Sequence, residues 1–162
     1  GKVPKRWDSV QPKNVTAAME KVVSQIILEV FKLQTRTVSL QYAGEDFGKC
    51  IYDRISYRSK EGKRLHVFLV MEERLALRTV GQMLDIEFKK VDKMVLDAVR
   101  QISQQMMVHM RGYFKMLEQY EFEKDHMLTK EQLEQDFLSE YPRYSLLFDT
   151  GIGYFAFCIK MR

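Results

Sequence analysis

The chain has 162 residues, of which 46% are hydrophobic and 30% are charged, and this is enough apolar material for one domain with a buried core. Its net charge of +4 is modest, and its basic residues are spread along the sequence rather than gathered in one block. We therefore expect no nucleic-acid partner, because such a partner needs a concentrated basic face, whereas an acidic protein partner is compatible with this charge.

The sequence also predicts a cytoplasmic location and no membrane partner. No apolar run approaches the ~20 residues that cross a bilayer, and the first residues lack the apolar centre of a signal peptide. Because the chain begins at Gly1 rather than Met, we expect a recombinant product or a fragment of a longer protein. Cys50 and Cys158 lie in strand-like runs without metal-binding spacing, which favours reduced core residues and no metal.

Residues 1–13 are predicted to form an irregular N-terminal arm, interrupted by Pro4 and Pro12, ahead of one domain over residues 14–162. Asn14 is the expected N-cap of an amphipathic helix over residues 15–33, in which apolar residues recur every three or four positions. Strand patterns follow at 37–43, 50–57 and 65–71, and the short turns between them favour an antiparallel meander.

A shorter helix over residues 72–84 is expected before the longest helical pattern in the chain, residues 91–117. The apolar positions of this long helix are three or four apart and should form its buried face. They are Val91, Val95, Ala98, Ile102, Met106, Met110, Phe114 and Leu117.

The charged residues 118–128 should leave the helix, and Thr129 should begin a short helix that ends before Pro142. Strands are expected at 144–150 and 154–161, around the segment Asp-Thr-Gly-Ile-Gly. The triplet Asp-Thr-Gly also occurs in aspartic proteases, but a single copy in a chain of this length favours a hairpin turn. The sum of these elements is an α+β fold, with two layers and an antiparallel sheet packed against two long helices.

A second stripe on the long helix is mostly polar and has the same spacing as the apolar one. This polar stripe consists of Asp97, Gln101, Gln104, Val108 and Arg111. A carboxylate followed by two amides in register on a helix held by its core is the most informative functional feature of the sequence. A solvated helix face is the simplest alternative explanation for it.

The order of elements and the segment GQMLDIEFKKVDKMVLDAVRQISQQM together resemble the CheC/CheX/FliY group of chemotaxis phosphatases, in the single-motif CheX form. In that group a helix carries Asp or Ser, three spacers, Glu, two spacers and Asn. The matching positions here are Asp97, Gln101 and Gln104, so both signature residues are replaced. Asp85 also stands where the family usually has Gly.

The resemblance implies that the domain binds a phosphorylated CheY-like receiver, and that the receiver supplies any Mg²⁺ while this chain carries no cofactor. In the family, the Glu contacts a receiver Lys and the Asn orients the water that attacks the phosphoryl-aspartate. Placing that water is most of what such a phosphoryl transfer requires. Gln101 lacks the charge of the family's Glu, and Gln104 keeps the amide on a longer arm, so dephosphorylation is a weaker expectation than binding.

The unrelated chemotaxis phosphatase CheZ suggests another assignment of the same residues, because it uses an acidic residue and a Gln one helical turn apart. By that analogy Asp97 would contact the receiver Lys and Gln101 would orient the water. Two other functions remain open: a non-catalytic dimerisation or scaffold domain, and a sensory domain with a small-molecule pocket. We also expect a homodimer that pairs through sheet edges, as members of the CheX form can.

Overall fold

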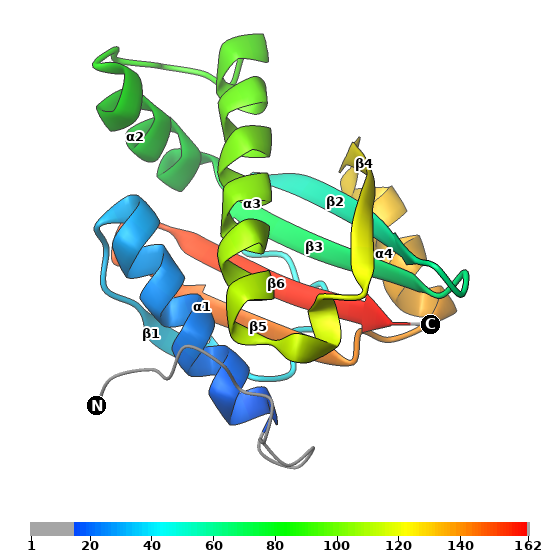
Figure 1. Ribbon diagram of the computed structural model, residues 1–162. Coiled ribbons are helices and arrows are strands. Elements are labelled where there is room, and N and C mark those ends of the chain that lie inside the picture. The colour runs from blue at the N-terminus through cyan, green and yellow to red at the C-terminus, as the bar shows by residue number, and fades with distance from the viewer. Residues whose placement is uncertain (1–14, 162) are drawn as a thin grey trace.

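The regular spacing of apolar residues in the first helical pattern produces helix α1 (Val15–Phe31), whose buried side lies on a β-sheet (Figure 1). The computed structural model describes residues 15–161, so the predicted arm and the N-cap Asn14 lie outside the described residues. The other helices are α2 (Glu73–Leu84), α3 (Lys93–Tyr113), the 3-10 turn η2 (Lys115–Leu117) and α4 (Lys130–Ser139). None of the described helices is both long enough and apolar enough to span a bilayer.

Six strands form one antiparallel sheet in the order β1-β5-β6-β3-β2-β4. They are β1 (Arg36–Ser39), β2 (Cys50–Ser59), β3 (Arg64–Glu72), β4 (Tyr120–Leu128), β5 (Tyr144–Asp149) and β6 (Tyr154–Met161). The expected α+β fold is confirmed. The two most continuously apolar strands, β3 and β6, lie in the middle of the sheet, where both of their faces are covered.

The predicted meander is half right. Strands β2 and β3 form the expected hairpin, but β1 does not pair with β2; it pairs with β5, which lies more than a hundred residues later in the chain. Residues 40–49 between β1 and β2 contain Gly44 and Gly48, both with positive φ, and carry the chain away from the first strand. The local sequence shows the turn but not the distant partner.

Residues 118–128 leave the helix as expected, but the sequence did not predict the strand that they form: Tyr120–Leu128 is β4, at one edge of the sheet. Tyr120 and Leu128 at its ends are buried, while most side chains between them are exposed or only partly buried. An edge strand pairs on one side only, so charged residues are tolerated there and even protect the edge from aggregation. Its charged sequence therefore hides its strand character.

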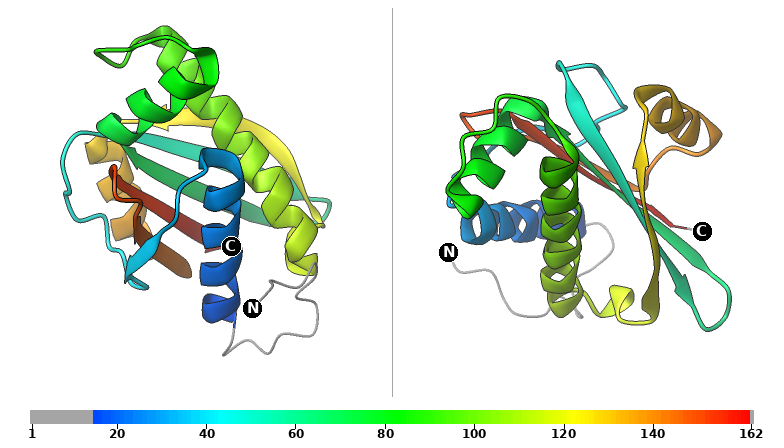
Figure 2. Two further views of the ribbon diagram at one scale, coloured as in Figure 1. Left: turned by 90° about the vertical axis from the view of Figure 1, so that its left-hand side faces the viewer. Right: turned by 90° about the horizontal axis from the view of Figure 1, so that it is seen from above.

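Helices α1, α2 and α3 cover one face of the sheet, and α4 lies against part of the opposite face (Figure 2). The two long helices α1 and α3 form the predicted second layer. Helix α4 begins with a capping box in which Thr129 and Gln132 satisfy each other's backbone amides. Its Phe137 packs edge-on against Phe68 of β3 and buries an apolar cluster on that side.

The connection between α2 and α3 sets the direction in which α3 runs. Asp85 ends α2 in the left-handed conformation, with φ of 54°, a conformation that Gly adopts more readily than Asp. Gly81 is required as well, because a Cβ there would lie 2.8 Å from the backbone oxygen of Ile86. Asp92 then caps α3 by accepting a hydrogen bond of 2.9 Å from the Val95 amide.

The predicted buried face of α3 is mainly confirmed, with a wider contact than expected. Val91 and Ala98 are only partly buried, whereas the predicted positions from Val95 to Leu117 are otherwise buried. Val99, Ser103 and Met107 are buried in addition, because α3 packs against α1 and α2 as well as the sheet. The buried hydroxyl of Ser103 marks a polar region inside this contact.

Candidate functional site

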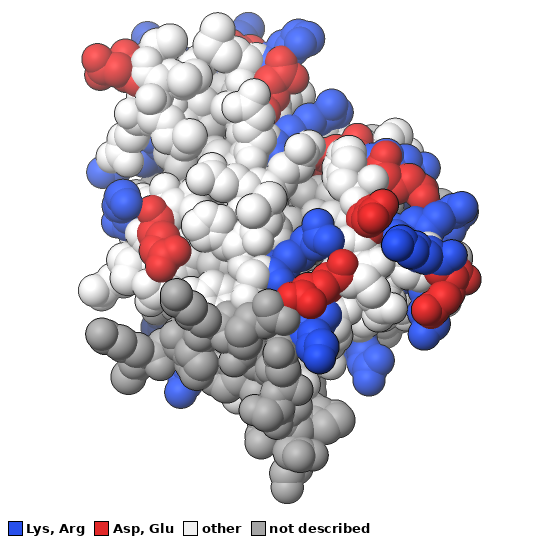
Figure 3. Space-filling model, viewed as in Figure 1, with Lys and Arg blue, Asp and Glu red and all other residues white. Residues whose placement is uncertain are grey.

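The polar stripe of α3 faces outward. Asp97, Gln101, Gln104 and Val108 are exposed and Arg111 is partly exposed, so the structure places the three predicted site residues on one accessible side of the helix. The steps of four and three residues between them correspond to about one helical turn each. Figure 3 shows that the surface over the middle of α3 is largely uncharged, with charges of both signs toward the β2–β4 edge.

Asp97 is held by an ion pair within its own helix. Its Oδ2 lies 2.9 Å from Nζ of Lys93, one turn earlier. The two side chains are 89% and 51% exposed, for Lys93 and Asp97 respectively. Such exposed i, i+4 pairs contribute about 0.3–0.5 kcal/mol, so the carboxylate of Asp97 can exchange this partner at little cost.

Gln104 is held from outside its helix. Its Nε2 donates a hydrogen bond of 2.9 Å to Oδ2 of Asp125 in β4. Because a carboxylate only accepts hydrogen bonds, it fixes the nitrogen of the carboxamide and leaves the oxygen Oε1 turned away. Among the described residues, Gln101 has no such partner. The two candidate amides therefore differ in how firmly they are oriented.

A buried polar layer lies directly beneath this contact, between α3 and the sheet. Asp53 in β2 is only 1% exposed, and its carboxyl group lies beside the side chains of Asp125, Ser103 and Arg100. Ile55 lies opposite Asp125 in the β2–β4 register, so Asp53 and Asp125 point to the same face of the sheet. Oδ1 of Asp125, Oγ of Ser103 and Nε of Arg100 are buried as well.

Burial, followed by the neighbouring carboxyl group of Asp125, raises the pKa of Asp53 from 3.8 to about 9. The hydroxyl of Ser103 and the positive charge of Arg100 act in the opposite direction and are outweighed. The Asp53 carboxyl is therefore protonated at neutral pH. The layer beneath Gln104 thus contains a neutral acid, Asp53, beside Asp125, Ser103 and Arg100.

Sequence reasoning missed both Asp53 and Asp125. Asp125 lies in the charged segment 118–128, for which no strand was predicted, and nothing in the local charge pattern places it under α3. Asp53 did carry a signal: it alternates with Ile51 and Ile55 in a strand, and an acidic residue on an apolar strand face is unusual. The contact between α3 and the two strands brings these residues together.

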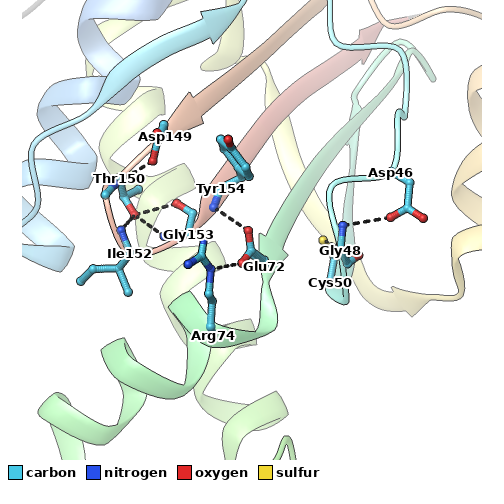
Figure 4. A network of polar contacts seen from close by, with 11 residues as sticks. Asp46, Gly48, Cys50, Glu72, Arg74, Asp149, Thr150, Ile152, Gly153 and Tyr154 are labelled. Carbon is cyan, nitrogen blue, oxygen red and sulfur yellow. Dashed lines mark hydrogen bonds and ion pairs between the residues drawn. The ribbon is translucent and has the colours of Figure 1, made fainter.

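The Asp-Thr-Gly-Ile-Gly segment is a hairpin turn between β5 and β6, as predicted (Figure 4). The hydroxyl of Thr150 donates to the Gly153 carbonyl over 2.7 Å, and Asp149 accepts from the Gly151 amide over 2.8 Å. Glu72, paired with Arg74 at the start of α2, accepts from the amide of Tyr154 over 3.3 Å. These bonds tie the turn to α2, and the aspartate is used within the turn.

The histidines have structural contacts. Nδ1 of His66 lies 2.8 Å from the Ser56 hydroxyl, and His109 lies at the boundary of α3, 3.6 Å from Glu29. His126 is exposed in β4. Within residues 15–161, no group of three or more His, Cys, Asp or Glu residues could hold a metal ion. The expectation that the chain carries no cofactor stays a prediction.

No family model matches this chain, and no curated protein matches it by sequence. Among solved structures, it is similar to the chemotaxis protein CheX from Vibrio vulnificus, with 12% identity, 88% of this chain and 93% of that chain covered, and a TM-score of 0.64. A CheC-like superfamily protein from Shewanella sp. PV-4 gives 12% identity, coverage of 88% and 94%, and a TM-score of 0.65.

A third similar structure is a CheX–CheY–BeF3–Mg²⁺ complex from Borrelia burgdorferi, with 10% identity, coverage of 88% and 94%, and a TM-score of 0.61. At these identities the likeness establishes a shared fold. The chain therefore has a CheX/CheC-like fold, and the resemblance inferred from its sequence is confirmed at that level.

Proposed function

We propose that this domain binds the phosphorylated form of a CheY-like receiver through the polar stripe of α3, in a chemotaxis or other two-component pathway. The observation that carries the proposal is the exposure of Asp97, Gln101 and Gln104 on one side of α3 within a CheX/CheC-like fold. The complex of CheX with CheY, BeF3 and Mg²⁺ supports it, because beryllium fluoride mimics a phosphoryl group.

Asp97 is the residue we assign to the charged contact with the receiver. A charge-assisted hydrogen bond to a receiver lysine contributes roughly 1.5–3 kcal/mol, whereas the exposed pair with Lys93 contributes about 0.3–0.5 kcal/mol. Exchanging Lys93 for a lysine in a desolvated interface is therefore favourable. This assignment gives Asp97 the role that Gln101, without a charge, cannot take.

Dephosphorylation of the receiver is the second candidate function, and the amides of the polar stripe support it. A carboxamide has an acceptor and a donor on one group, so it can orient a water toward the phosphoryl-aspartate. Mg²⁺ at the phosphorylation site would come from the receiver. The domain would then be an aspartyl-phosphate phosphatase that relies on placing water rather than on covalent chemistry.

The setting of this function is also part of the proposal. We place the domain in the cytoplasm, where receivers work, and as a homodimer that pairs through a sheet edge. Strands β1 and β4 are the two edges of the described sheet. The last strand, β6, is an interior strand, so its apolar surface is already covered.

The test is a calorimetric titration of the domain with a CheY-like receiver from the same genome, with and without BeF3 and Mg²⁺. We expect tighter binding of the activated receiver, and at least a tenfold weaker interaction when Asp97, Gln101 and Gln104 are all replaced by Ala. The matched control is Glu131→Ala with Gln135→Ala on α4, which removes exposed polar groups from the opposite face.

Two outcomes would redirect the proposal. Binding that is unchanged in the triple variant supports the scaffold or dimerisation function, in which the polar stripe has no role. No binding to either receiver state, together with a small molecule that stays bound in native mass spectrometry, supports the sensory function.

A further inference from the structure

Of the three candidate site residues, Gln104 is the one whose side chain is held, within residues 15–161, by a side chain of another element. Lys93, the partner of Asp97, lies on the same helix, and Gln101 has no hydrogen-bond partner among residues 15–161. The bond from Gln104 to Asp125 joins α3 to β4 across 21 residues of sequence. This difference distinguishes between the two amides that could orient a water.

Asp125 is itself placed with little freedom. Its Oδ2 reaches Gln104 at the exposed flank of α3, while its Oδ1 is buried beside the layer that contains Asp53. Its backbone is fixed by the pairing of β4 with β2, where Asp125 lies opposite Ile55. A half-buried carboxylate on a paired strand is a far stiffer anchor than another side chain on the same helix.

We propose that Asp125 is a positioning residue, which orients the Gln104 carboxamide so that Oε1 faces outward and accepts a hydrogen bond from the attacking water. This inference rests on the proposed function in its phosphatase form and names Gln104, rather than Gln101, as the water-orienting amide. The longer Gln side chain carries an entropic disadvantage relative to Asn, and the fixed bond to Asp125 offsets it by restricting the rotamers of Gln104.

The reaction that this geometry serves is hydrolysis of an acyl phosphate. The water oxygen forms a bond to phosphorus as the bond between phosphorus and the aspartate oxygen breaks, and the electron pair stays on the aspartate carboxylate. One proton of the water remains on the released hydrogen phosphate, and the other passes to solvent. Gln104 only orients the water in this step, and Asp125 does not contact it.

The first test needs no receiver. In the wild-type protein, the NMR signals of the Gln104 side-chain NH₂ should be shifted from those of a free carboxamide, and their exchange with solvent should be slower. Asp125→Ala should move them to the free position and speed their exchange roughly threefold to tenfold. Glu121→Ala, which removes an exposed carboxylate from the same strand, should leave them unchanged. Unchanged Gln104 signals in Asp125→Ala would overturn the inference.

The second test measures how fast a phosphorylated CheY-like receiver decays at increasing concentrations of the domain. Asp125→Ala should lower the rate at saturation roughly tenfold without changing the concentration that gives half of the effect. Asp125→Asn, which keeps a neutral acceptor and the shape of the side chain, should recover part of the rate. Circular dichroism of each variant checks that the fold is retained.

The outcomes separate the inference from the function on which it rests. Acceleration by the wild type that persists in Asp125→Ala, or is lost in Gln101→Ala and not in Gln104→Ala, overturns the positioning role while the phosphatase function stands. No acceleration by the wild type overturns the phosphatase function, and the catalytic part of the inference with it.

Discussion

Replacing the buried Asp53 by Asn should stabilise the domain, and the gain should grow as the pH rises. Asp53 is 1% exposed and lies beside the carboxyl group of Asp125. Burial, followed by the neighbouring Asp125, raises its pKa from 3.8 to about 9. Asn has nearly the same shape as the protonated acid, and it does not ionise in the unfolded chain.

The sign follows from where the proton is bound. Between pH 3.8 and about 9 the folded protein holds a proton on Asp53 that the unfolded chain has released. Folding therefore takes up a proton, and the free energy of unfolding falls as the pH rises through this range. Each pH unit changes it by about 1.4 kcal/mol, so three units change it by about 4 kcal/mol. In Asp53→Asn this contribution is absent.

Urea unfolding followed by circular dichroism at pH 5 and pH 8 measures the effect. The free energy of unfolding of Asp53→Asn minus that of the wild type should increase by about 4 kcal/mol between the two pH values. Asp97→Asn, the same change at an exposed carboxylate, should show a change of less than about 0.5 kcal/mol. If the free energies of unfolding of Asp53→Asn and the wild type differ by the same amount at both pH values, Asp53 is not protonated in the folded protein, which refutes the argument.

Three further substitutions test other parts of the structure. Thr129→Ala removes the capping box of α4 and should lower the free energy of unfolding by about 1 kcal/mol in urea unfolding, whereas Thr129→Ser should retain most of it. Gly81→Ala should lower the melting temperature, because the new Cβ would lie 2.8 Å from the Ile86 carbonyl oxygen and should reduce the free energy of unfolding by about 1–3 kcal/mol. An unchanged melting temperature would contradict this close approach. Lys93→Ala should change the free energy of unfolding by less than about 0.5 kcal/mol. Because it frees Asp97, it should leave receiver binding unchanged or slightly tighter. Clearly weaker binding in calorimetry would contradict the proposed exchange of partners.

The helices were predictable because their information is local. The three-and-four spacing in α1 and α3 reports directly which side is buried, and Thr129 with Gln132 marks a helix start within four residues. The turn at Asp149–Gly153 is local in the same sense. These features fix the long helix and hence the direction in which Asp97, Gln101 and Gln104 project.

The sheet was harder to predict, because strand pairing is not local. Nothing near β1 indicates that its partner is β5, and the charges of β4 resemble those of a loop. Missing β4 also meant missing Asp125, so the bond that orients Gln104 was beyond the reach of sequence patterns. Half of the candidate site is a helix face, which periodicity reveals, and the other half is a strand contact, which it does not.

The most direct test of the central claim is an NMR titration of the isotope-labelled domain with a CheY-like receiver activated by BeF3 and Mg²⁺. We expect the backbone and side-chain signals of Asp97, Gln101 and Gln104 to shift, while those of α4 on the opposite face remain in place. The shifts should be much smaller with the receiver before activation. Shifts confined to α4 or to the edge strand β1, or equal effects with and without BeF3, would contradict the claim that α3 binds the phosphorylated receiver.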